Sequence, residues 1–139
     1  MNVSVKIAAG QRGEATSLSA RLVRGDLLDK SCPSREVLKH VTSRWGVLVL
    51  IVLESGTHRF SELRRAVNGV SERMLAQTLQ WLEGDGLVKR TDFQVVPPHV
   101  EYNLTPLGRE GAEKVRVLAD WIEISLPRVL AASGERKEA

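Results

Sequence analysis

The chain has 139 residues and a mass of 15.4 kDa, which suits one domain with a tail at either end. Its longest apolar run, Val47–Leu53, has 7 residues, far below the roughly 18 that cross a bilayer. The first residues lack a signal-peptide core, and one cysteine excludes an internal disulfide or a cysteine-rich zinc site. We therefore expect a cytoplasmic protein with no membrane contact, no metal and no cofactor.

The net charge of +3 and the pI of about 9.4 are a weak indication of an anionic partner. Residues 58–90 hold six basic and four acidic groups, whereas residues 105–139 hold six of each. The basic excess therefore lies in the middle of the chain. A solvated surface explains so mild an excess as readily as a nucleic-acid partner does.

The N-terminal segment carries weak structural signals. Residues 1–16 are small, polar and glycine-bearing, so we expect a flexible arm. Leu18 and Leu22 belong to a spacing that permits a short amphipathic helix over residues 17–28. Gly25 argues against its continuity.

Two further helices are predicted next. Pro33 suits a first helical position, where its missing N–H needs no partner. The second helix starts near Ser43 and ends at Leu53, before Gly56. It is apolar nearly all round, which predicts a buried, central helix.

A pair of short helices follows a stub of strand at residues 58–60. We expect Ser61 to cap the first helix, Asn68-Gly69 to form the turn, and Ser71 to cap the second helix. The residues expected to face inward are Leu63, Val67, Leu75, Leu79 and Leu82.

The apolar period then changes from helical to alternating. Residues 87–93 and 100–104 alternate like strands and predict a hairpin with a long loop. Thr105-Pro106 starts a last helix, which Pro127 should kink or end, and residues 133–139 should be a frayed tail. Its apolar stripe consists of Val115, Leu118, Ala119, Ile122, Leu126 and Val129.

This order predicts a mainly α-helical fold with a small β-hairpin, a winged helix-turn-helix, within residues 17–132. In that fold the second helix of the pair enters the major groove of DNA. Its expected outward residues are Glu72, Arg73, Ala76, Gln77 and Gln80. Arginine can pair with guanine and glutamine with adenine, so this face has the chemistry to read bases.

Other groups could hold the DNA backbone. Ser71 and the free N–H groups of the first helical turn suit a phosphate. The flanking cations are Arg59, Arg64, Arg65, Lys89 and Arg90. A solvated helix face is the alternative for Arg73 and Gln77. Glu72 fits the positive end of its helix better than it fits DNA, and Asp92 opposes a strongly basic wing.

Several motifs together resemble one family, the HxlR-type winged-helix regulators of the MarR-like superfamily. About 90 of the 139 residues take part, between Cys32 and Trp121. The matching stretches are Cys32-Pro33 with Arg44-Trp45, His58–Arg65, Val70–Leu75, Leu82–Val88 and Val96–Gly108. The chain departs from the family in having Ser43-Arg44-Trp45 for Gly-Lys-Trp and His99 for a basic wing residue.

The resemblance implies a bacterial homodimer that binds a pseudo-palindromic promoter site as an activator or repressor. It implies dimerisation through the terminal helices, for which the candidates are Leu18, Leu22, Val115, Leu118, Trp121, Ile122, Leu126 and Val129. Ser61, Met74 and His99 are further candidates for binding double-stranded DNA. Packing within one subunit is the alternative for the apolar stripe.

Cys32 precedes a predicted helix N-terminus, with Lys30 and Arg35 nearby. Such surroundings favour the thiolate. Some members of the family use a cysteine here to sense oxidants or electrophiles, so Cys32 is a candidate sensor. The alternative is a small, half-buried capping residue.

Other classes of function fit less well. His40, His58 and His99 share no metal-ligand spacing, and no glycine-rich phosphate loop occurs, so we expect no enzyme. A protein-binding module would need an apolar exposed face on the second helix of the pair, the one expected to enter the major groove. A small-molecule effector could bind in a dimer cleft lined by Trp45, Trp81 and Trp121, although such residues more often belong to a core.

Overall fold

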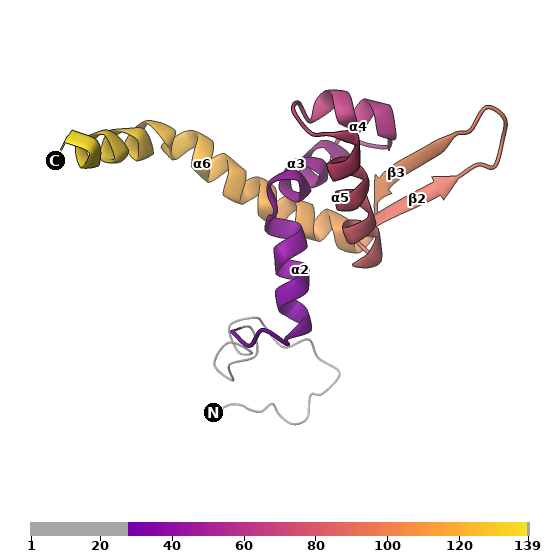
Figure 1. The fold of residues 1–139 in the computed structure, drawn as a ribbon, viewed down its shortest axis with the longest axis horizontal. Helices are drawn as coiled ribbons and strands as arrows, with labels where there is room; N and C mark the ends of the chain where they lie inside the picture. The colour runs from indigo at the N-terminus through magenta and orange to yellow at the C-terminus, as the bar shows by residue number, and fades with distance from the viewer. Residues whose placement is uncertain (1–27, 139) are drawn as a thin grey trace. The chain divides into compact units, whose positions relative to one another are not determined.

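The computed structural model describes residues 28–138, which form five helices and three short strands. The element order is α2 (Pro33–Thr42), α3 (Arg44–Leu53), β1 (His58–Arg59), α4 (Phe60–Ala66), α5 (Glu72–Gly84), β2 (Val88–Asp92), β3 (Val100–Leu104) and α6 (Pro106–Glu138). The expected helix over residues 17–28, with Leu18 and Leu22, lies outside the described residues except for Leu28. The mainly helical winged fold is confirmed (Figure 1).

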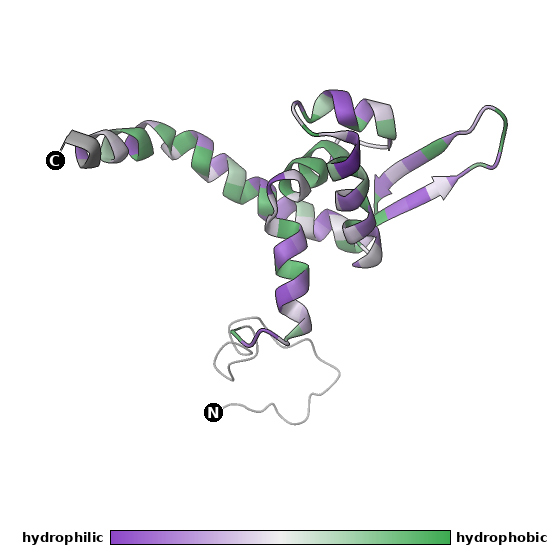
Figure 2. Cartoon of the chain, in the orientation of Figure 1, coloured by the Kyte–Doolittle hydropathy of each residue, from purple (hydrophilic) through white to green (hydrophobic). Residues whose placement is uncertain are grey.

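The main hydrophobic cluster lies in the part of the chain that begins at His40. Helix α3 is central, as predicted, because it contacts α4, α5, β3 and α6. Its strongly apolar composition is visible in Figure 2. Its residues Val49, Leu50 and Leu53 are buried with Leu63, Leu75, Leu79 and Leu82 from the two following helices.

The predicted helix starts are confirmed at three places by their caps. The side chain of Ser43 accepts a hydrogen bond from the backbone N–H of Gly46, and that of Ser71 accepts one from Met74. Thr105 Oγ1 accepts from the N–H of Gly108 at 2.9 Å. Each bond satisfies an N–H group that would otherwise lack a partner in the first turn.

The predicted cap at Ser61 is wrong. Helix α4 begins at Phe60, and its N-cap is Arg59, two residues before Ser61. The Glu62 carboxylate reaches back and accepts the backbone N–H of Arg59 at 2.7 Å. This bond satisfies the backbone N–H of the N-cap residue itself, and Ser61 is an exposed residue of the first turn.

The sheet has the order β1-β3-β2, with both pairs antiparallel. The β2–β3 hairpin was predicted, and it pairs Val88 with Leu104 at its base. The pairing of His58 and Arg59 in β1 with Tyr102 and Glu101 in β3 was not, because it joins segments more than 40 residues apart. It fixes the start of α4 to the hairpin.

Helix α6 is longer than predicted. Of the two effects expected of Pro127, a kink or an end, the end does not occur, because the residue lies inside the helix. The helix also includes residues 133–138, which we expected to be frayed. Its axis changes direction toward the C-terminal end (Figure 1), as a proline inside a helix would produce. The first turn of α6 packs closely on the backbone just before β2, because a Cβ on Gly108 would lie 1.9 Å from the carbonyl oxygen of Leu87.

Candidate nucleic-acid interface

The turn between α4 and α5 is held by two buried side chains. Val67 and Val70 are 3% and 5% exposed, and the N–H of Val70 bonds to the carbonyl of Val67. Between them Gly69 has a φ of 96°, a conformation that favours glycine. The turn therefore sets α5 at a defined angle to α4.

Helix α5 buries one face and exposes the other. The buried face contains Leu75, Leu79 and Leu82, as predicted, and also Thr78, which is 1% exposed. Thr78 is a core position that the apolar pattern missed. Its hydroxyl donates to the carbonyl of Met74 at 2.7 Å, which removes the cost of burying it.

The opposite face of α5 is exposed at every position we expected. The five expected residues are Glu72, Arg73, Ala76, Gln77 and Gln80, and Met74 beside them is also exposed. Arg73 has no ion pair or hydrogen bond with any of residues 28–138. Its guanidinium is therefore available for an external acceptor.

The cations around α5 differ in how much of their charge is free. Arg59, Arg64 and Arg65 are all exposed, on β1 and α4. Arg64 is paired, because its Nη1 lies 2.8 Å from Glu72 Oε2 in the first turn of α5. Glu72 thus links the two helices besides lying at the positive end of its own. Its carboxylate would compete with a phosphate for Arg64.

The wing, residues 88–104, places its two cations on opposite faces. Lys89 and Arg90 are adjacent on β2, and successive side chains of a strand alternate between faces. Arg90 is in register with the buried Tyr102, and Lys89 with Asn103. Only one of them can therefore contact a backbone along a given face of the wing.

The far end of the wing is apolar rather than basic. Phe93, Val95 and Val96 are exposed there, the last by 97%. His99, a predicted DNA contact, is half-buried. Its Nε2 lies 2.7 Å from Glu101 Oε2, and its ring meets that of Phe93 edge-on at 4.9 Å. Glu101 of the same chain therefore already supplies an acceptor for this imidazole.

Cys32 is more enclosed than expected, at 7% exposed. Its N–H donates to the carbonyl of Asp29, and its own carbonyl accepts from the N–H of Arg35. The Arg35 guanidinium donates to the carbonyl of Leu28 at 2.9 Å. The backbone N–H and hydroxyl of Ser31 hold the pKa of the Asp29 carboxyl below its usual value.

The apolar stripe of α6 divides between two surroundings. Val115 is 5% exposed and belongs to the core, so its prediction as a dimer contact is wrong. Leu118, Trp121, Ile122, Leu126 and Val129 are exposed by 38–57%. The apolar residues of this stretch appear in Figure 2 along the free length of the helix. We call residues 117–130 the distal segment of α6.

The three tryptophans lie on different helices. Trp45 and Trp81 are half-buried on α3 and α5, and Trp121 is exposed on α6. Within residues 28–138, no three His, Cys, Asp or Glu side chains gather as a metal site would require. Nor does that part of the chain contain a helix long and apolar enough to cross a membrane.

Comparison with known proteins gives one consistent family. The model of the HxlR-like helix-turn-helix family matches residues 40–129. The HTH-type transcriptional regulator YtfH of Escherichia coli is 65% identical over 120 residues, which cover 86% of this chain and 95% of that protein.

Solved structures agree. The structure of ytfH from Salmonella typhimurium is 64% identical, with a TM-score of 0.76 over 79% of this chain and 98% of that one. The reduced form of the redox regulator HypR is 32% identical, with a TM-score of 0.65 over 71% and 98% of the two chains. The chain therefore belongs to the HxlR-like helix-turn-helix family, a winged-helix family of DNA-binding transcriptional regulators.

Proposed function

We propose that the chain regulates transcription as a homodimer that reads a two-fold symmetric promoter site with the N-terminal half of α5. The observation that carries this proposal is the division of α5 into a buried apolar face and an exposed face bearing Arg73, Gln77 and Gln80. These side chains offer the donors and acceptors that base edges in the major groove require.

The backbone contacts come from around this helix. Ser71 and the first-turn N–H groups of α5 face one phosphate, and exposed groups on β1, α4 and β2 hold others. The residues proposed for these contacts are Arg59, Ser61, Arg64, Arg65, Lys89 and Arg90. Arg64 must leave Glu72 to take part, so we expect it to contribute less than Arg59 or Arg65.

The second subunit is proposed to cover the distal segment of α6. Exposed apolar side chains at Leu118, Trp121 and Ile122 cost free energy in water and gain it in an interface. A two-fold axis through this segment would present two copies of α5 to successive major grooves.

The proposal also includes a class of effector, an oxidant or an electrophile. HypR, a similar protein, is a redox regulator. We carry forward a sensor role for Cys32, in which oxidation or alkylation of the thiol changes the fraction of the dimer that can bind DNA. Its burial means that the reagent must reach it through an opening of the fold around it.

The test is fluorescence anisotropy with a labelled duplex from the gene's own upstream region and a scrambled duplex. Both are titrated at several salt concentrations, with and without diamide. We expect tight, sequence-selective binding whose affinity falls steeply with salt, and release by diamide. Binding that ignores sequence, or none to either duplex at low salt, would contradict the proposal. The second result would favour the protein-interaction module.

A further inference from the structure

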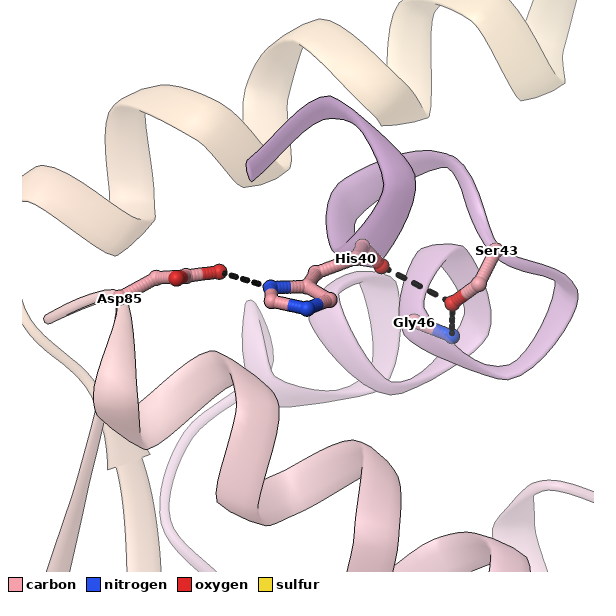
Figure 3. A network of polar contacts seen from close by, with 4 residues as sticks. All are labelled: His40, Ser43, Gly46 and Asp85. Carbon is pink, nitrogen blue, oxygen red and sulfur yellow. Dashed lines mark hydrogen bonds and ion pairs between the residues drawn. The ribbon is translucent and has the colours of Figure 1, made fainter. Parts of the chain in front are cut away.

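A polar network joins the C-terminal end of α5 to the junction between α2 and α3 (Figure 3). His40 Nδ1 lies 2.7 Å from Asp85 Oδ2, and the two side chains are only 12% and 13% exposed. His40 is in the last turn of α2, and Asp85 is the C-cap residue of α5. The pair therefore connects residues 45 positions apart.

The same imidazole is held by α5 at a second point. Its ring stacks on that of Trp81, with the centroids 4.7 Å apart and the planes 18° from parallel. One helix thus supplies both a carboxylate at the edge of the imidazole and an aromatic surface against its face. Such a double contact fixes the direction of the ring as well as its position.

The backbone of His40 is held by α3. Its carbonyl accepts the hydroxyl of Ser43 at 2.9 Å, and the oxygen of that hydroxyl accepts the N–H of Gly46 at 3.1 Å (Figure 3). The approach is close, because a Cβ on Gly46 would lie 2.2 Å from the His40 carbonyl oxygen. Any motion of His40 relative to α3 is therefore restricted.

We propose that His40 is a positioning residue for DNA recognition, which fastens the C-terminal end of α5 to α3 and so sets the angle at which its N-terminal half meets the bases. This inference rests on the proposed function. Helix α5 has 13 residues, so it is about 20 Å long at 1.5 Å per residue. A tilt of a few degrees at Asp85 moves Arg73 by about 1 Å, which base-edge hydrogen bonds do not tolerate.

The alternative is that the pair only stabilises the fold. If the pair only stabilises the fold, breaking it lowers the free energy of unfolding. The folded protein's preference for one DNA sequence over another is then unchanged. A positioning pair lowers that preference, because base contacts depend on the angle of α5 more than phosphate contacts do. The ratio of two affinities therefore separates the two roles.

The experiment uses two complementary substitutions at position 40 in the full chain. His40→Phe keeps a ring for Trp81 and removes the donor to Asp85. His40→Asn keeps a donor at the place of Nδ1 and removes the ring. Asp85→Asn keeps the shape of the acceptor without its charge. The control is Glu54→Gln, which weakens the 2.9 Å ion pair with Arg116 between α3 and α6 and leaves α5 alone.

The DNA probe is a duplex selected from a randomised library by the wild-type protein, compared with a scrambled duplex. We expect His40→Phe to weaken the selected duplex about tenfold and the scrambled one less than about twofold. His40→Asn and Asp85→Asn should each lose about threefold on the selected duplex. Affinities are measured where circular dichroism shows each variant to be folded.

An unchanged affinity ratio in folded His40→Phe and Asp85→Asn would overturn the inference and leave a stabilising pair. The same loss in Glu54→Gln would also overturn it, since any perturbation of α3 would then suffice. If the wild-type protein enriches no sequence from the library, the proposed function fails first and the inference fails with it. The two failures are thus distinguished before any variant is made.

Discussion

Helix α5 and the distal segment of α6 are both exposed along one side, but they expose different chemistry. The outer face of α5 carries Arg73, Gln77 and Gln80, while its apolar residues are covered by the same chain. The distal segment of α6 leaves Trp121, Ile122 and other large apolar residues in solvent.

The difference indicates two kinds of partner. A polar, charged face suits the hydrated groove of a nucleic acid, which offers hydrogen-bond groups and negative charge. An apolar face gains free energy only against another apolar surface. The second copy proposed above would supply one, because a two-fold interface places the same segment on both sides.

The first prediction tests whether the apolar face of α5 is part of the core. Leu79→Ala leaves a cavity at a position 2% exposed and should lower the unfolding free energy by about 2–5 kcal/mol. Urea denaturation at a fixed protein concentration measures this loss. Leu107→Ala, at a leucine 55% exposed, is the matched control and should cost less than about 0.5 kcal/mol. Equal losses at the two leucines would contradict the burial of α5.

The second prediction concerns a substitution that removes a large apolar side chain from the distal segment. Trp121→Ala should weaken dimerisation by about 2–4 kcal/mol, because a large aromatic side chain near the centre of an interface contributes strongly. Sedimentation velocity over a range of concentrations should show dimer in the wild-type protein and monomer in the variant. Leu107→Ala, which lies outside the distal segment, should leave the dimer intact. An unchanged dimer in Trp121→Ala would place the interface elsewhere.

Much of the fold could be predicted because its signals are local. The caps at Ser43, Ser71 and Thr105 depend on residues three positions away, and the helical and alternating periods define α5 and the hairpin. The pairing of β1 with β3 and the close approach of Gly108 to Leu87 join distant segments. No single-sequence periodicity records such contacts.

The candidate site likewise has residues that the sequence predicted and contacts that it did not. Subtracting the apolar face of α5 predicts five outward residues, and all five are exposed: Glu72, Arg73, Ala76, Gln77 and Gln80. The pairs Arg64–Glu72 and His40–Asp85 were not, because polar residues on different elements show no common period. Val115 was placed in an interface because a stripe on a long helix does not reveal where the subunit's own core ends.

The third prediction tests the polar side of the comparison. Arg73→Ala should weaken binding to the selected duplex by about 1–3 kcal/mol and relax the base preference at one position of each half-site. Anisotropy titrations with single-base variants of the duplex measure both effects. Arg109→Ala removes an exposed arginine on α6 and serves as the control. If Arg73→Ala weakens selected and scrambled duplexes equally, Arg73 contacts phosphate rather than a base.

The smallest effect is expected at Cys32, which belongs to neither of the compared surfaces. Cys32→Ser should leave the affinity for the selected duplex within about twofold of wild type without oxidant, because the residue precedes α2 and lies outside the helix-turn-helix and the wing. Diamide should release wild-type protein from the duplex and leave the variant bound. Loss of DNA binding in reduced Cys32→Ser would show that the buried thiol is structural. Release of the variant by diamide would remove the thiol as the sensor, since the chain has one cysteine.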